Sequence, residues 1–441
     1  MTNTPLQFPW GDQRLSLSLP DSWKVAGILE PASVAPAADP SEEAERALAQ
    51  PVGMPRLSEL ARPGLNVVIV MDDGSRPTPV DLILPAVVKE LERGGLSREQ
   101  MTLVPALGVH RAMEESEIRQ RAGAAMDGMR WENPNCDDPD KMTFLGSTLR
   151  GTPVWINRSV AEADLVVSIG CIEPHIIASF GGGYKNIVPG VAGRATIAHN
   201  HAINCTPDTF NMVGQPIDHN PMRLDLEEAA GKLALQKHAP KLFIVNAILN
   251  HCKEVVRVVA GSPVDAHRYG VGVSAGMYGV KVKRPADVVI TASHPMDTDL
   301  RQGVKALANT VRAVKPGGVV ITLVRAEEGV GVFGLANRKL PLGRGALKTL
   351  APVLLKLVPK LKLKGMGEED RFFLYFALQA MRHARLLMYG PTIPVQTQER
   401  LPFVEFVAKP EDAIRMASQR FSGGAEVLVF PHGGITYPDL G

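Results

Sequence analysis

Residues 164–201 read DLVVSIGCIEPHIIASFGGGYKNIVPGVAGRATIAHNH, and this stretch indicates both a fold class and a ligand site. It begins with the apolar run 164–170, which is typical of a strand buried on both faces of a parallel sheet. The loop Gly181–Gly183 carries no side chains, so its backbone N–H groups can approach an anion closely. Lys185 stands beside this loop. The pattern therefore predicts a parallel α/β sheet with an anion-binding loop.

The glycine loop does not have the pattern of a P-loop. A P-loop requires Gly directly before its Lys and Ser or Thr directly after it. Here Tyr184 precedes Lys185 and Asn186 follows it. A nucleotide site of that class is excluded, whereas an ordinary phosphate-binding role for Lys185 stays open.

Earlier runs extend the α/β pattern toward the N-terminus. Short alternating strands are expected within residues 1–30, and Asp39 begins a helix with proline at the first helical position. Continuous apolar strands are expected at 66–71 and 101–106, with a helix at 81–93 between them. This strand–helix–strand order is typical of a parallel sheet.

Polar side chains follow three of the expected strands. Asp73 and Arg76 come after the first, His110 after the second and His175 after the third. Because the carboxyl ends of parallel strands meet at one edge of a sheet, these side chains are predicted to share one crevice. Taken singly, each histidine is more often structural, and the Asp73 segment is often only a turn.

A second strand–helix–strand unit follows near residue 275. Strands are expected at 287–293 and 318–324, with a helix at 298–314, and AEVLVF near the C-terminus supplies a last strand. The basic, apolar segment 337–364 contains two internal prolines, which favours short surface helices or a lid over an interfacial membrane helix.

Composition excludes several classes of protein. The 441 residues include 48 basic and 46 acidic side chains, a net charge of +2, so nothing favours a nucleic-acid partner. Four cysteines without a CxxC pair fit a reducing compartment. The N-terminus resembles no signal peptide, and no apolar run approaches the roughly 18 residues of a membrane span. We expect a cytoplasmic protein with a small-molecule partner and no membrane contact.

Four motifs in order resemble the lactate racemase family. They are DDGSRPTP at 72–79, GVHR at 108–111, PHIIASFGGGYKNIVPG at 174–190 and DLRQGVK at 299–305. Ten residues separate His175 from Lys185, and sixteen separate Lys185 from His201, as in the family pattern. The resemblance spans most of the chain.

The resemblance implies a cofactor, a set of site residues and a partner. The cofactor would be a nickel-pincer nucleotide, pyridinium-3,5-bisthiocarboxylic acid mononucleotide, attached covalently to Lys185 and supplied by maturation enzymes. His201 would ligate the nickel, with His199 as its competitor. His110 and His175 would be catalytic. The cofactor would also contact Asp73, Gly74, Ser75 and Arg76, and the substrate would contact Arg76, Arg301, Gln302 and Lys305.

The implied domain organisation is an α/β fold with two domains, each built around a mostly parallel sheet with flanking helices. Residues 1–272 would form the cofactor-binding domain, completed by the tail 398–441. Residues 273–397 would form a substrate or lid domain. The active site is expected in the cleft between the two.

The implied reaction is racemisation or epimerisation of a 2-hydroxy acid. The α-hydrogen of such an acid is weakly acidic because its carboxylate stabilises a carbanion poorly, so hydride removal is the easier route. A histidine takes the hydroxyl proton, and two histidines serve the two hydroxyl orientations.

Departures from the family pattern bear on the substrate. Arg301 stands where the family has an aromatic residue, and no tryptophan follows Trp155. Both favour a malate-like or sugar-acid substrate over lactate. Two other functions stay open: a metal-dependent hydrolase with His110, His175 and His201 around its metal, and a non-catalytic protein that binds nickel or nucleotide.

Overall fold

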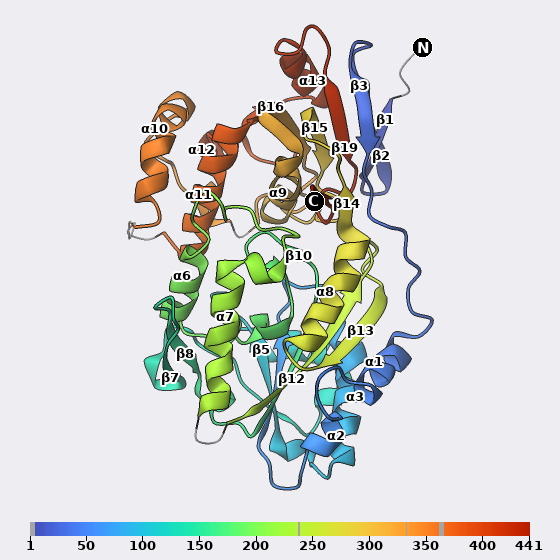
Figure 1. Cartoon of the computed structure of the whole chain (residues 1–441), viewed down its shortest axis with the longest axis vertical. Coiled ribbons are helices and arrows are strands. Elements are labelled where there is room, and N and C mark those ends of the chain that lie inside the picture. Colours follow the sequence, from blue (N-terminus) through green and yellow to red (C-terminus); the bar gives the residue numbers. More distant parts are fainter. Residues whose placement is uncertain (1–4, 237–238, 332, 361–365) are drawn as a thin grey trace. The chain divides into compact units, whose positions relative to one another are not determined.

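The computed structural model describes residues 5–236, 239–331, 333–360 and 366–441. The chain divides into two compact units (Figure 1). Unit 1 comprises Met1–Ala32, Asn204–Gly214 and Tyr278–Gly441, and unit 2 comprises Ser33–Ile203 and Gln215–Met277. The described part of the chain contains no helix that is long and apolar enough to cross a membrane.

Unit 2 is built around a six-stranded sheet in the order β13-β12-β9-β4-β5-β6. All neighbouring pairs are parallel except β12 with β13. Each of the three strands expected from the sequence is present, and β4 is buried throughout, as a central parallel strand must be. The strands are β4 (Val67–Asp72), β5 (Met101–Ala106), β6 (Arg130–Trp131), β9 (Leu165–Cys171), β12 (Lys241–Leu249) and β13 (Val255–Gly261).

Helices cover both faces of this sheet. The helices α1 (Pro40–Ala49) and α3 (Val80–Arg93) pack their apolar sides on alternate residues of the strands. As expected, Asp39 caps α1, accepting N–H bonds from Ser41 and Glu42. On the other face, α8 (Asp265–Tyr278) lies close to β12 and β13, where its Gly270 leaves no room for a side chain.

Smaller elements complete unit 2. The helices are α2 (Leu57–Leu60), α4 (Glu115–Ala122), α5 (Arg158–Ala161), α6 (Arg194–Ala202) and α7 (Pro221–Gly231). Two hairpins are formed by β7 (Met142–Ser147) with β8 (Pro153–Asn157), and by β10 (Pro174–His175) with β11 (Ser179–Phe180).

Unit 1 contains a second six-stranded sheet, in the order β18-β17-β16-β15-β19-β3, and every neighbouring pair is parallel. The β1–β2 hairpin and α13 pack on one face, while α9 and α11 lie against β15, β16 and β17. The strands are β1 (Leu6–Trp10), β2 (Gln13–Leu17), β3 (Lys24–Ile28), β14 (Gly279–Lys281), β15 (Ala286–Ala292), β16 (Val314–Leu323), β17 (Arg385–Tyr389), β18 (Glu405–Val407), β19 (Glu426–Phe430) and β20 (Tyr437–Asp439).

The helices of unit 1 differ in part from expectation. The helix expected at 298–314 is shorter, because α9 ends at Thr310 and β16 already begins at Val314. Within 337–364 the structure has a surface helix, α10, which includes Pro352; residues 361–364 of that segment lie outside the described residues. The helices are α9 (Leu300–Thr310), α10 (Arg344–Leu357), α11 (Glu368–His383), α12 (Val395–Arg400) and α13 (Pro410–Ser418).

The grouping of the chain termini differs from the expected domain boundaries. The tail 398–441 was expected to complete the N-terminal domain, but its strand β19 lies between β15 and β3 in the sheet of unit 1. Residues 1–32 belong to the same unit. The physical reason is that β19 is a buried apolar strand, so its backbone groups need a hydrogen-bonding neighbour on each side, and sequence order does not say which strands those are.

Candidate active site

The carboxyl edge of the unit 2 sheet carries the polar residues that the sequence singled out. From β4 the chain continues to β5 on one side, whereas β9 pairs on the other side of β4. Ligands of open parallel sheets bind at such a reversal of strand order. Asp72 ends β4 and Asp73 follows it, and His175 follows β9 by way of Glu173. A hydrogen bond of 2.8 Å from Gly108 N to Gly190 O joins the loop after β5 to the loop after Lys185.

Asp73 orients His110. Its Oδ2 lies 2.6 Å from His110 Nδ1, and its Oδ1 accepts hydrogen bonds from the N–H and the hydroxyl of Ser75. Burial alone would raise the pKa of Asp73, but the bonds from His110 and Ser75 and the charge of Arg76 lower it on balance. The carboxylate therefore stays ionised and accepts the Nδ1–H of His110, so a neutral His110 has its lone pair on Nε2.

Arg76 pairs with Glu173, which sequence analysis did not identify. Arg76 Nη1 lies 2.7 Å from Glu173 Oε1, a bond that joins the loop after β4 to the loop after β9. Arg121 of α4 donates to the carbonyls of Asp72 and Arg76, at 2.6 and 2.9 Å, and so fixes the loop from the other side. Despite burial, the carboxylates around Arg76 keep its pKa raised, so it is a permanent cation at this edge.

His175 and Lys185 form the second pair of the site. Lys185 Nζ lies 2.9 Å from His175 Nε2. His175 Nδ1 accepts hydrogen bonds of 3.2 Å from the backbone N–H groups of Ile177 and Ala178, so in the neutral ring the proton lies on Nε2. His110 and His175 are thus set in opposite states, one with a lone pair on Nε2 and one with a proton there.

Lys185 has an unusually acidic ammonium group. Burial, together with the positive charges of Arg76 and Arg223, lowers its pKa to about 7, although Asp72 and Glu173 act in the opposite direction. A large fraction of Lys185 is therefore an uncharged amine at neutral pH. Such an amine can accept the Nε2–H of His175 and can act as a nucleophile.

The glycine loop beside Lys185 does not form the expected anion cradle. Gly181 N–H donates to Glu173 O at 2.7 Å, and Gly183 N–H donates to Asn246 Oδ1 at 2.8 Å. Gly182 and Gly183 have positive φ, and a side chain at Gly183 would collide with buried protein groups. The glycines are required by close packing inside the protein, which removes the N–H groups that an anion would need.

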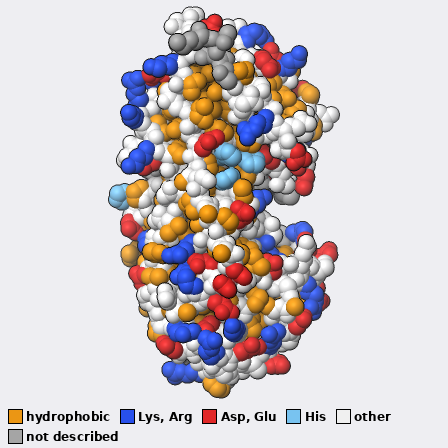
Figure 2. Space-filling view, turned by 90° about the vertical axis from the view of Figure 1, so that its right-hand side faces the viewer, with side chains coloured by type: hydrophobic (Ala, Val, Ile, Leu, Met, Phe, Trp, Pro, Cys, Tyr) orange, Lys and Arg blue, Asp and Glu red, His pale blue; other side chains and the backbone are white. Residues whose placement is uncertain are grey.

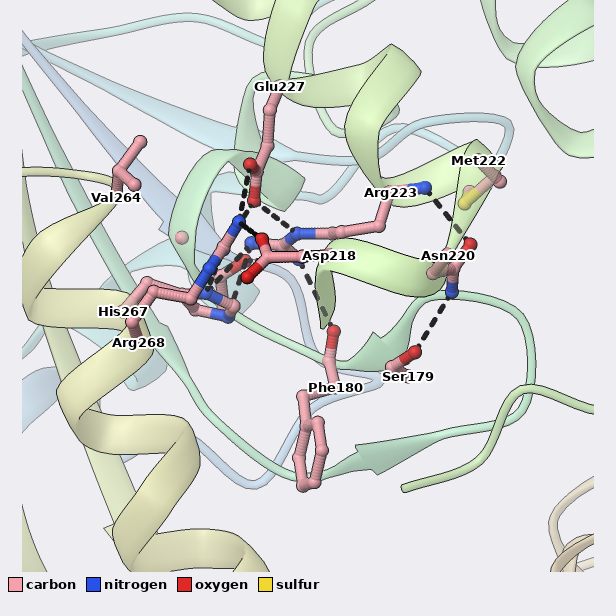
Figure 3. A network of polar contacts seen from close by, with 12 residues as sticks. Ser179, Phe180, Asp218, Asn220, Met222, Arg223, Glu227, Val264, His267 and Arg268 are labelled. Atoms are coloured by element: carbon pink, nitrogen blue, oxygen red, sulfur yellow. Dashed lines mark hydrogen bonds and ion pairs between the residues drawn. The ribbon is translucent and has the colours of Figure 1, made fainter. Parts of the chain in front are cut away.

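A buried network holds this loop from behind (Figure 3). Arg223 of α7 has no exposed surface and donates to the carbonyls of Phe180 and Gly182. Its guanidinium also pairs with Glu227 at 2.8 Å and contacts the buried ring of His267. Burial, and then the charge of Arg223, holds the pKa of His267 well below its usual range, so this ring is neutral and donates from Nε2 to Gly181 O. No sequence motif indicated this network.

Replacing Arg223 by alanine is expected to lower the free energy of unfolding by roughly 3–5 kcal/mol, because the buried carbonyls of Phe180 and Gly182 lose this donor, and Glu227 and His267 each lose one of their partners. Urea unfolding followed by circular dichroism measures this. The matched control is Arg194→Ala, which breaks an exposed pair with Asp137 and should cost about 1 kcal/mol or less. Equal losses in the two variants would contradict the structural role of Arg223.

His201 and His199 lie on the same helix, α6, and are held differently. His201 Nδ1 donates to the carbonyl of Ile197 at 2.8 Å, which places the lone pair of the neutral ring on Nε2. This backbone bond is typical of histidines that ligate metals. His199 Nδ1 lies 2.8 Å from the hydroxyl of Thr152, which itself donates to Asp225. Both rings fit a metal ligand, so the geometry does not eliminate His199.

The expected residues are brought together only in part. Asp73, Ser75, Arg76, His110, His175 and Lys185 all lie at the edge described above. The described residues include no group of three His, Cys, Asp or Glu side chains placed to hold a metal ion, so the three-histidine hydrolase site is not assembled. Arg301, Gln302 and Lys305 belong to unit 1, on the first turns of α9, where Asp299 caps the helix by accepting from Gln302 N.

These observations define a class of protein: a doubly wound α/β fold with two histidines, an arginine and a lysine of lowered pKa at the reversal point of a parallel sheet. Residues 10–211 match the model of the lactate racemase N-terminal domain. The chain is 31% identical to lactate racemase of Thermoanaerobacterium thermosaccharolyticum over 334 residues, which cover 75% of this chain and 76% of that protein. It is 30% identical to lactate racemase of Lactiplantibacillus plantarum over 66% of this chain and 68% of that one.

The fold agrees with this relationship. The structure of the lactate racemase apoprotein from Thermoanaerobacterium thermosaccharolyticum superposes with a TM-score of 0.85 at 25% identity, covering 99% of this chain and 100% of that one. A protein of Thermotoga maritima shares the fold, with a TM-score of 0.63 at 16% identity over 91% of this chain and 99% of that one. The chain belongs to the lactate racemase family.

Proposed function

We propose that this protein is a racemase or epimerase of 2-hydroxy acids that works with a nickel-pincer nucleotide attached to Lys185. The observation that carries the proposal is the opposite setting of the two histidines. Inversion at a hydroxyl-bearing carbon needs one group that takes the hydroxyl proton and another that gives a proton back on the other face. His110 has the lone pair and His175 has the proton.

The residues present fit the proposed cofactor. An uncharged Lys185 amine can form the covalent link that a permanently protonated lysine could not form. An imidazole that donates from Nδ1 to a backbone carbonyl, as His201 does, suits nickel through Nε2. When bound, the cofactor would accept the α-hydride and return it to either face of a planar 2-oxo acid. Enzymes that build the cofactor are the implied protein partners, and the four free cysteines fit a cytoplasmic site of action.

The chain's own residues would bind the substrate and move its proton. Arg76 is a planar, permanent cation at the same edge as the two histidines, which suits the substrate carboxylate. Asp73 and Ser75 hold the His110 loop, so that His110 Nε2 can take a hydroxyl proton without reorienting. Arg301 in place of an aromatic residue, and the lack of tryptophan after Trp155, favour a substrate with a second polar group over lactate.

Racemisation in D₂O tests the mechanism. A hydride that returns from the cofactor keeps its protium, whereas an α-proton held on imidazole exchanges with solvent. We therefore expect the cofactor-loaded enzyme to convert one enantiomer into the other with little deuterium at the α-carbon, as measured by mass spectrometry of the product. Incorporation of one deuterium per inversion would refute hydride return even if both histidines proved essential.

A further inference from the structure

The sheet of unit 1 has its own reversal of strand order. From β15 the chain moves outward through β16, β17 and β18, and then returns with β19 on the opposite side of β15. In open parallel sheets the crevice for a ligand lies beyond the carboxyl ends of the two strands at such a reversal. For this sheet, those strands are β15 and β19.

A pair of histidines stands at this point. His294 follows β15 and His432 follows β19, and their rings meet edge to face with centroids 5.1 Å apart. Close backbone packing fixes the pair, because Gly434 N–H donates to His294 O and a side chain at Gly434 would lie 2.1 Å from Ser293 O. Histidine side chains are visible as a group on the molecular surface in Figure 2.

His294 is oriented in the same way as His110. Its Nδ1 lies 2.9 Å from Asp297 Oδ2, and Asp297 Oδ1 accepts a 2.5 Å hydrogen bond from the Ser293 hydroxyl. In the neutral ring, donation from Nδ1 to the carboxylate leaves the lone pair on Nε2, which can accept a hydrogen bond from a ligand hydroxyl. The two sheets of the protein thus each place an aspartate–histidine pair at their reversal point.

Two basic residues of unit 1 contact the segment that carries His294. Lys305 of α9 places its Nζ 4.0 Å from Met296 Sδ, in the loop that carries His294. Arg325 follows the neighbouring strand β16, and its N–H donates to Ser293 Oγ at 3.2 Å, while its side chain pairs with Glu327. Two imidazoles whose nitrogens can accept from a hydroxyl, with a lysine on the neighbouring helix that can donate to a carboxylate, suit a small ligand that carries such oxygens.

We propose that His294 and His432 form a ligand site of their own within unit 1, which binds hydroxy acids that carry a carboxylate or a hydroxyl beyond C2. Asp297 is the positioning residue for His294. The identity of the ligand class rests on the proposed 2-hydroxy acid function, but binding at this site does not require a loaded cofactor. Lactate has no oxygen beyond C2, which makes it a matched control ligand.

Binding to the full-length, unloaded protein tests the proposal. Calorimetric titrations would use malate, gluconate and lactate with the wild type, His294→Asn and His432→Asn. The asparagine at 294 keeps a donor for Asp297 and removes only Nε2. We expect each variant to weaken binding of malate, gluconate or both about tenfold or more, with lactate binding unchanged. The control is His383→Asn, since His383 bonds Val314 O at the opposite end of β16.

A second measurement guards against misfolding. Imidazole NMR signals of ¹⁵N-histidine-labelled wild type, assigned with the two variants, should shift saturably with whichever of malate and gluconate binds, and not with lactate. If the imidazole signals stayed unchanged with both malate and gluconate, the proposed ligand site at His294 and His432 would be overturned. An equal weakening of lactate binding in the two variants would overturn it as well. If malate or gluconate bound at His294 and His432 but the cofactor-loaded wild type did not racemise any 2-hydroxy acid, only the proposed function would be overturned.

Discussion

Replacing Lys185 by alanine is expected to abolish racemisation while leaving the fold intact. Lys185 Nζ contacts His175, and this lysine supplies the amine of the proposed covalent link. Mass spectrometry of the purified, matured protein should show a nickel-containing adduct on the wild-type peptide and none on the variant. Lys185→Arg should fail equally, because a guanidinium keeps the charge but cannot replace the nucleophilic amine. Lys89→Ala, which changes an exposed lysine in the same unit, should keep full adduct and activity.

The pKa of Lys185 predicts how attachment and stability depend on pH. The nucleophilic amine is the uncharged form, so attachment to the apoprotein should accelerate as pH rises through about 7 and then level off. The unfolded chain, with an ordinary lysine pKa, binds more protons than the folded protein between about 7 and 10.5. Unfolding free energy should therefore rise with pH across that window.

Lys185→Met removes this pH-dependent term, so the difference in unfolding free energy between wild type and variant should shrink as pH rises. Chemical denaturation of the two apoproteins at several pH values measures it. A constant difference between them, with an unmodified Lys185 in active enzyme, would contradict both the lowered pKa and the covalent link.

Replacing either His110 or His175 by alanine is expected to slow racemisation by a factor on the order of 10²–10⁴, the usual contribution of general acid–base catalysis. The two losses should differ in kind. In the proposed mechanism each ring serves one orientation of the hydroxyl group: His110 takes the proton of one enantiomer through Nε2, and His175 takes that of the other once it has given its own Nε2 proton to a product. In single-turnover experiments each variant should fail to form the 2-oxo acid from one enantiomer, and the two variants should fail with opposite enantiomers.

Two further variants belong to this experiment: a control at an exposed histidine, and a variant of the residue that orients His110. His219→Ala removes an exposed histidine of unit 2 and should leave the rate unchanged. Asp73→Asn keeps the size of the side chain but removes the carboxylate that accepts from His110, so it should impair the same enantiomer as His110→Ala. If both histidine variants lost the two enantiomers equally, the assignment of one histidine to each face would be wrong.

Hydrophobic pattern was enough to find the strands that place the site. The runs at 66–71, 101–106 and 164–170 are β4, β5 and β9 within one or two residues. A strand that is buried on both faces must be apolar throughout, so it can be recognised from a continuous run of apolar residues in a single sequence. The polar residues after those strands lie at one edge of the sheet, because parallel strands end there together; their roles in a site remain a prediction.

Other features could not be read from the chain because they depend on partners distant in sequence. Arg223 and His267 were missed because a buried cation has no local signal; only the fold brings it to the carbonyls of Phe180 and Gly182. The glycine loop was read as an anion cradle, yet its N–H groups at Gly181 and Gly183 are used by Glu173 and Asn246. The partner of each backbone donor is a tertiary property.

By itself, then, the sequence determined the family and the parallel α/β class, because strand burial and ordered motifs are local. Tertiary structure alone decided that the C-terminal tail completes the sheet of unit 1, since β19 pairs with β15 and β3. It alone set the opposite tautomers of the neutral His110 and His175 rings and brought His294 beside His432. Each of these features depends on contacts between residues that are distant in sequence and are brought together only by the folded sheet. Hydrogen-bond partners and burial then decide which ring nitrogen carries a proton and which groups are charged.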